Sequence, residues 1–132
     1  MSEYYEHPAS SPEGAPTTAR GVAISTSFDI PGTKITRYCG SCFGVVVRSM
    51  GFAKGIGASF KALAGGEVTQ YTRLLEDSRR HAMDRMVQNA QVLGANAVIG
   101  MRYDATEIAG GVTEVLAYGT AVIVEPDGGA YR

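Results

Sequence analysis

The sequence predicts an α+β fold, in which one antiparallel sheet has one long amphipathic helix packed on one of its faces. Three observations predict it. Strand-like segments stand on both sides of a single long helical segment, the apolar residues of that segment follow one stripe, and a glycine pair separates the last two strand-like segments. One helix cannot cover both faces of a sheet of four or more strands. We therefore expect other copies of the chain to cover the second face in an oligomer.

Residues 1–20 are expected to form a disordered tail. They are rich in Pro, Ser and Thr, and they offer little apolar surface to offset the entropy lost on ordering. The alternative is a short linear motif in this tail that binds a partner. The folded domain is expected over residues 21–126, followed by a short C-terminal tail at 127–132.

Two strands and a short helix are expected first. The segment VAISTSFDI alternates apolar and polar residues up to the turn signal Pro31-Gly32, so it predicts a strand of about five residues. Residues 33–50 are rich in β-branched and aromatic residues and predict a second strand, kinked or turned at Gly40-Ser41. Residues 51–66 hold five glycines among apolar residues at helical spacing, and predict a short helix that stops at Gly65-Gly66.

Residues 67–94 predict one long amphipathic helix of about 24 residues. Thr69 is suited to cap its N-terminus, and Gly94 is suited to follow its last turn. Charged residues occupy the opposite face. The expected buried stripe comprises Tyr71, Leu75, Ser78, Ala82, Met86, Ala90 and Leu93.

The segments ANAVIGMRYDATEI and VTEVLAYGTAVIVEP follow the helix, and each alternates well enough for a strand. Gly110-Gly111 lies between them and predicts a tight turn. The folded domain is therefore expected to end in a hairpin.

The charge balance argues against some classes of partner. The 12 basic and 13 acidic residues give a formal net charge of −1, whereas nucleic acids and anionic membranes attract a surplus of positive charge. No run of roughly 18 apolar residues is present, so no membrane span is expected. The N-terminus lacks the pattern of a secretory signal, and the two cysteines are expected to be reduced in the cytoplasm.

Three features carry a family resemblance: the stretches LGANAVIGMRYD (93–104) and GTAVIV (119–124), and the spacing Gly65-Gly66…Tyr71…Arg79…Arg85-Met86. With them the chain resembles the YbjQ family of putative heavy-metal-binding proteins over residues 21–125. The resemblance implies a dodecin-like subunit of a ring-forming oligomer, a homopentamer, and it implies a metal-binding label without an established activity. No residue of LGANAV is a metal ligand, so this signature identifies a fold rather than a reaction.

Cys39 and Cys42 are the candidate metal ligands, and the expected ion is zinc or copper. Thiolates are soft ligands, and the CxxC spacing lets both reach one ion. A closed zinc site needs four ligands, so a ring would have to bring several pairs together, or a histidine would complete the set. In a straight strand residues three apart point to opposite faces, so the sulfurs converge only if Gly40-Ser41 forms a turn or bulge. The alternative is that both cysteines are small core or interface residues.

A redox role for the pair is disfavoured, because the strand-like FGVVVR that follows it offers no helix dipole to stabilise a thiolate. His81 follows Asp77 by four residues and precedes Asp84 by three, which predicts either a weak divalent-ion site or, as we favour, charge pairing on a solvated helix face. His7 is expected to be solvated in the tail. Basic and acidic residues alternate on the helix, so no nucleic-acid groove is expected.

The function expected from the sequence is non-enzymatic, because no acid–base pair or activated nucleophile can be named. We expect a cytoplasmic ring-forming homo-oligomer that binds or sequesters a metal ion. One alternative is a purely structural or scaffolding oligomer with incidental cysteines. Another is a small-ligand binder that uses clefts between subunits near the glycine-rich residues 51–66, although these residues match no phosphate-binding loop.

Overall fold

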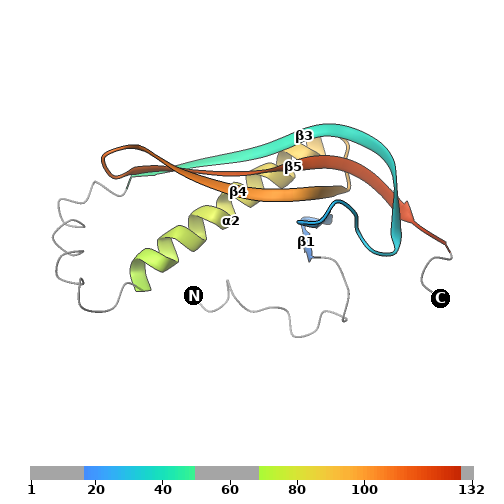
Figure 1. Ribbon diagram of the computed structural model, residues 1–132, viewed down its shortest axis with the longest axis horizontal. Coiled ribbons are helices and arrows are strands. Elements are labelled where there is room, and N and C mark those ends of the chain that lie inside the picture. The colour runs from blue at the N-terminus through green and yellow to red at the C-terminus, as the bar shows by residue number, and fades with distance from the viewer. Residues whose placement is uncertain (1–16, 50–68, 129–132) are drawn as a thin grey trace.

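The computed structural model describes residues 17–49 and 69–128, which form five strands and one helix (Figure 1). The elements are β1 (Thr17–Ala19), β2 (Val22–Ile24), β3 (Thr33–Ser49), α2 (Thr69–Val92), β4 (Ala97–Ala109) and β5 (Val112–Pro126). The predicted α+β class is confirmed. The predicted tail up to residue 16 and the short helix expected in residues 51–66 lie outside the described residues.

The sheet is mixed, with the strand order β1-β2-β4-β5-β3. Most neighbouring strands are antiparallel, but β2 pairs with β4 in parallel, through Ala23 with Ala97 and Ile24 with Val98. The prediction of an antiparallel sheet is therefore wrong at this pair. Parallel pairing needs a long crossover connection, and β3 and α2 supply it between β2 and β4.

The first strand begins inside the segment predicted to be disordered. Thr17–Ala19 pairs antiparallel with Val22–Ile24, so the disordered tail cannot extend to residue 20. The turn consists of Arg20 and Gly21, with φ angles of 52° and 79°. Positive φ at both positions is typical of a two-residue hairpin turn whose twist matches that of its strands.

Helix α2 lies across one face of the sheet and has the predicted length of 24 residues. The middle of the predicted stripe is buried, from Ser78 to Ala90. Leu75 and Leu93, near the two ends, are 41% and 38% exposed. The N-terminal end of α2 diverges from the strands in Figure 1. Among the helices of the described ranges, none has the length and apolar character needed to cross a membrane.

Gly94 ends the helix as predicted, with a φ of 86°. The Gly94 N–H donates to the Gln91 carbonyl at 2.9 Å, and the Ala95 N–H donates to the Ala90 carbonyl at 3.0 Å. This pair of bonds is the Schellman motif, which requires a left-handed residue at this position. It turns the chain directly into β4.

The two faces of the sheet are covered to different extents. On the helix side, small and apolar residues of α2 pack on β3, β4 and β5 in the main core. On the other side, the segment before β3 places Ile30 over Ala97, Ile99 and Val122 in a smaller core. Beyond that small core, large apolar side chains of β3 remain exposed, including Phe43 at 57% and Val47 at 55%.

Candidate functional site

A β-bulge in β3 brings the two cysteines to the same core. The pairing of β3 with β5 passes from Tyr38–Val122 to Gly40–Ala121, so Cys39 is an extra residue without a direct partner. Gly40 has a φ of 114°, which a glycine adopts readily. Because a bulge interrupts the alternation of faces, Cys42 lies within the helix-side core and Cys39 packs against it. An irregularity was predicted at Gly40-Ser41; the bulge lies one residue earlier, at Cys39, and the strand continues through it.

Cys42 is a buried, neutral thiol. It is 0% exposed, and its Sγ donates to the Gly119 carbonyl oxygen at 3.6 Å. Burial raises the pKa of Cys42 to about 11. The hydrogen bond to the Gly119 carbonyl lowers this pKa, but by less than burial raises it. Thiolates, rather than thiols, bind metal ions, so Cys42 in this state is a poor ligand. Cys39 is partly exposed, and both cysteines are free thiols.

The described residues do not form a closed metal site within one chain. No group of three or more His, Cys, Asp or Glu side chains gathers in the ranges 17–49 and 69–128. The cysteine pair therefore lacks a third and a fourth ligand there, whereas a closed zinc site has four. The two thiols fit a soft metal ion only if other groups complete the set.

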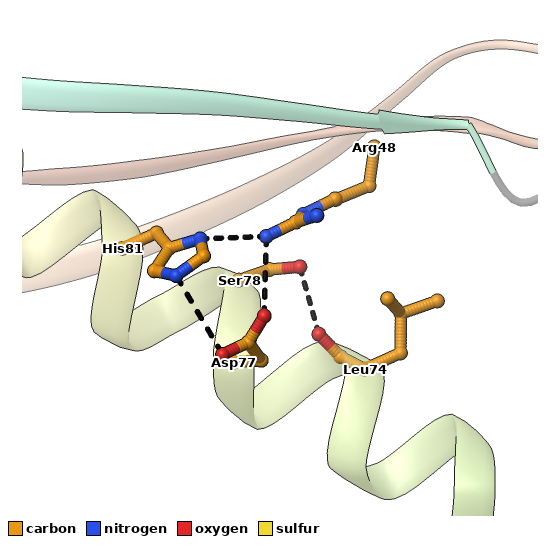
Figure 2. A network of polar contacts seen from close by, with 5 residues as sticks. All are labelled: Arg48, Leu74, Asp77, Ser78 and His81. Atoms are coloured by element: carbon orange, nitrogen blue, oxygen red, sulfur yellow. Dashed lines mark hydrogen bonds and ion pairs between the residues drawn. The ribbon is translucent and has the colours of Figure 1, made fainter.

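His81 belongs to a small polar network with Asp77 and Arg48 (Figure 2). His81 Nε2 lies 3.6 Å from Asp77 Oδ1, one helical turn away, which confirms the predicted charge pairing on the helix. Arg48, from the end of β3, places its Nη2 atom 3.2 Å from Asp77 Oδ2 and 2.6 Å from His81 Nδ1. One guanidinium nitrogen therefore contacts both the imidazole and the carboxylate that were candidate ligands of a divalent ion.

The same network borders a cavity of about 440 Å³ beside β3 and α2. Three arginines from three different elements face this cavity, and Asp84 joins them on its wall instead of completing a metal site with His81. Sequence reasoning missed Arg20 and Arg48, since nothing near them in the sequence signals that they meet. The cavity is lined by Arg20, Val46, Val47, Arg48, His81, Asp84, Arg85 and Gln88.

Helix α2 also contacts the open edge of β3. Asn89 Oδ1 accepts a hydrogen bond from the Phe43 N–H at 3.0 Å, and Arg85 Nη1 donates to the Val45 carbonyl at 3.1 Å. Unpaired edge groups tend to pair with another chain. The helix therefore provides hydrogen-bond partners for two backbone groups of this edge.

Known proteins are similar to this chain along nearly all of its folded part. The YbjQ family, described as "Putative heavy-metal-binding", matches residues 22–125. A UPF0145 protein of Methanoregula boonei is 50% identical over 109 residues, which are 83% of this chain and 90% of that protein. A UPF0145 protein of Burkholderia multivorans is 53% identical over 106 residues, which are 80% of this chain and 87% of that protein.

Among solved structures, a protein of unknown function from the DUF74 family of Pediococcus pentosaceus is similar with a TM-score of 0.46 and 16% identity. That similarity covers 80% of this chain and 100% of the other. The family assignment rests on the sequence matches, which span the helix and all but the first strand of the sheet. The chain therefore belongs to the YbjQ family, as the sequence resemblance predicted, and has UPF0145 proteins as its relatives.

Proposed function

We propose that this chain is the non-enzymatic subunit of a cytoplasmic ring of five identical copies. The ring and its five-fold number come from the family resemblance. One observation supports the self-association: the described residues of one chain, 17–49 and 69–128, leave two opposite sheet edges and part of an apolar sheet face open. The two free thiols suit a reducing compartment.

The open edges lie on β3 and on the far part of β4. β3 is the last strand in the sheet order, and β2 pairs only with Ala97 and Val98 of β4. From Arg102 to Ala109, β4 pairs with β5 alone within the described part of the chain. Pairing the β3 edge of one copy with the β4 edge of the next is a head-to-tail contact, and such contacts generate rings when the rotation closes.

The apolar face lies on β3 and β5, on the side away from the helix. Phe43 and Val47 are more than half exposed, and Val45 between them is partly exposed. Their register partners include Tyr118 and Leu116, which are also partly exposed. Burying such side chains in an assembly contributes roughly 25 cal/mol per Å² of apolar surface. A second copy supplies the same surface and the same open edges.

Light scattering after gel filtration tests this proposal. The parent is expected to have five times the 13.9 kDa mass of the chain. Val47→Lys is expected to lower the mass, because it places a charge on the exposed apolar face. Val92→Lys is the matched control, since Val92 is 85% exposed at the end of α2. A monomeric parent at micromolar concentration would contradict the proposal.

A second candidate function is metal sequestration, with Cys39 and Cys42 as the residues that would hold zinc or copper. The observation that favours it is the bulge, which places both thiols at one core with Cys39 partly exposed. The described residues of one chain do not complete the ligand set, so neighbouring copies in a ring would have to contribute.

Elemental mass spectrometry of tag-free protein, purified under reducing conditions, tests this candidate beside a Cys39→Ser/Cys42→Ser double variant. Stoichiometric zinc or copper in the parent alone would support it. A parent that carries no metal and retains none when metal is added would contradict it. A stable ring without metal would then favour a scaffolding role.

A further inference from the structure

The cavity beside β3 and α2 collects positive charge from three separate elements. Arg20 lies in the turn between β1 and β2, Arg48 lies near the end of β3, and Arg85 lies on α2. Asp84 is the single carboxylate among the described lining residues, so three positive charges face one negative charge. The whole chain has a net charge of −1. The cavity is therefore a local concentration of positive charge on a slightly acidic protein.

Two of these arginines have no counter-ion within residues 17–49 and 69–128. Arg85 Nη1 donates to the Val45 carbonyl, which is a neutral acceptor and leaves the charge of Arg85 uncompensated. Arg20 is bound through its backbone, because its carbonyl oxygen accepts from Gln91 Nε2 at 3.0 Å. Two guanidinium groups that face one cavity, with no carboxylate partner among the described residues, create a potential that favours an anion there.

The third arginine is held in a fixed orientation (Figure 2). A guanidinium group donates hydrogen bonds and cannot accept them. The Nδ1 atom of His81 therefore accepts the hydrogen bond from Arg48 Nη2, and the ring proton of His81 is on Nε2, which faces Asp77. The Arg48 Nε atom is buried and has no acceptor in the described chain, and Nη1 keeps further N–H donors. A donor group already fixed by two neighbours loses little freedom when it binds an oxyanion.

We propose that this cavity binds the phosphate group of a small phosphorylated molecule. Planar guanidinium groups match the oxygens of a phosphate and bind them in pairs. Although Asp77 pairs with Arg48, the arginines around the cavity still outnumber the carboxylates, which favours a phosphate anion there. A volume of about 440 Å³ lies within the usual range of small-molecule sites, which leaves room for an organic part beside the phosphate group. This site does not involve the cysteines.

Calorimetric titration of the full chain tests the proposal. The probes are inorganic phosphate and glycerol 3-phosphate, each at an ionic strength held constant with sodium chloride, because salt screens exposed charges. The variants are Arg20→Gln and Arg85→Gln. Each is expected to weaken binding of both probes about tenfold or more, as the loss of one charged hydrogen-bond donor does. Arg37→Gln is the matched control, since Arg37 is exposed on β3 and lies outside the cavity; it is expected to change binding less than about twofold.

The outcomes show whether the cavity binds phosphate at all and, if it does, whether the ligand is an organic phosphate or phosphate itself. Tighter binding of glycerol 3-phosphate than of phosphate would support an organic phosphate as the ligand, and equal binding would support phosphate itself. A parent without saturable binding would overturn the proposal, as would equal weakening by Arg37→Gln. Light scattering on the same samples distinguishes one further case. If the parent binds neither probe and the cavity variants lose oligomeric mass, the arginines serve a contact between subunits, and the proposal is wrong.

Discussion

The side-chain oxygen of Asn89 accepts a hydrogen bond from the backbone N–H of Phe43 at 3.0 Å, which ties α2 to the open edge of β3. Asn89→Ala removes this acceptor and leaves the Phe43 N–H without its helix partner. We expect the free energy of unfolding to fall by about 1–2 kcal/mol, which urea denaturation measures. Gln88→Ala is the control, because Gln88 is an exposed neighbour on the same helix. Equal stability of the two variants would show that water replaces Asn89 without loss.

Gly44 sets how closely the helix approaches the sheet. A Cβ atom at Gly44 would overlap the backbone of Ala82 and Met86, so Gly44→Ala would force α2 away from β3. We expect a loss of stability of about 1–3 kcal/mol or more, measured as a lower Tm by circular dichroism. Gly110→Ala is the matched control, since a Cβ there meets nothing within 4 Å and the glycine does not have a positive φ. A Gly44→Ala protein as stable as the control would contradict the close contact.

The raised pKa of Cys42 predicts a pH dependence of stability. The folded state holds the thiol proton more tightly than the unfolded state, so the stabilisation is fully present below the ordinary thiol pKa of 9.0. It decreases as the pH rises from there towards about 11. The free energy of unfolding is expected to fall by at most about 1.4 kcal/mol per pH unit in this window.

Other groups titrate in the same window, so the measured quantity is the difference between the parent and Cys42→Ala. Urea midpoints of both proteins between pH 8 and about 10 provide it. The parent is expected to lose stability faster with increasing pH than the variant does. Parallel curves would show that Cys42 reaches solvent in the folded state. Cys39→Ala is the control, because Cys39 is partly exposed.

The network of Arg48, Asp77 and His81 is expected to contribute little to stability. The Arg48 and Asp77 side chains are both 31% exposed, and ion pairs of this kind are worth about 0–1 kcal/mol. A double-mutant cycle with Arg48→Gln and Asp77→Asn measures their coupling, which we expect to decrease when salt is added. A coupling above about 2 kcal/mol that salt does not change would mean that the pair is shielded from solvent.

The long helix and the final hairpin were predictable because their signals are local. The apolar stripe, Gly94 and the pair Gly110-Gly111 each act on residues within a few positions of themselves. The strand Thr17–Ala19 carries no alternation of its own, and it forms because it pairs with β2. The parallel pairing of β2 with β4 depends on the path of all the chain between them, which no local pattern records.

The candidate site was predictable only in part, for a related reason. Cys39 and Cys42 were singled out together, and Gly40 indicated the irregularity that brings them to one core. His81 and Asp77 were recognised as neighbours because they lie one helical turn apart. Arg48 is 29 positions from Asp77, and its position depends on how far α2 is shifted along β3. The cavity therefore follows from packing rather than from any motif.

The parallel pair of β2 and β4 joins segments that are far apart in the sequence. Ala23 pairs with Ala97 across the connection that holds β3 and α2, so we expect the β1–β2 hairpin to join the sheet late in folding. Contacts so distant in sequence form late, and an element attached by few hydrogen bonds opens first. We therefore expect the backbone amides of residues 17–24 to exchange with solvent hydrogen sooner than those of β5. Since Arg20 belongs to this hairpin, the cavity loses one arginine at each such opening, while Arg48 and Arg85 stay in place.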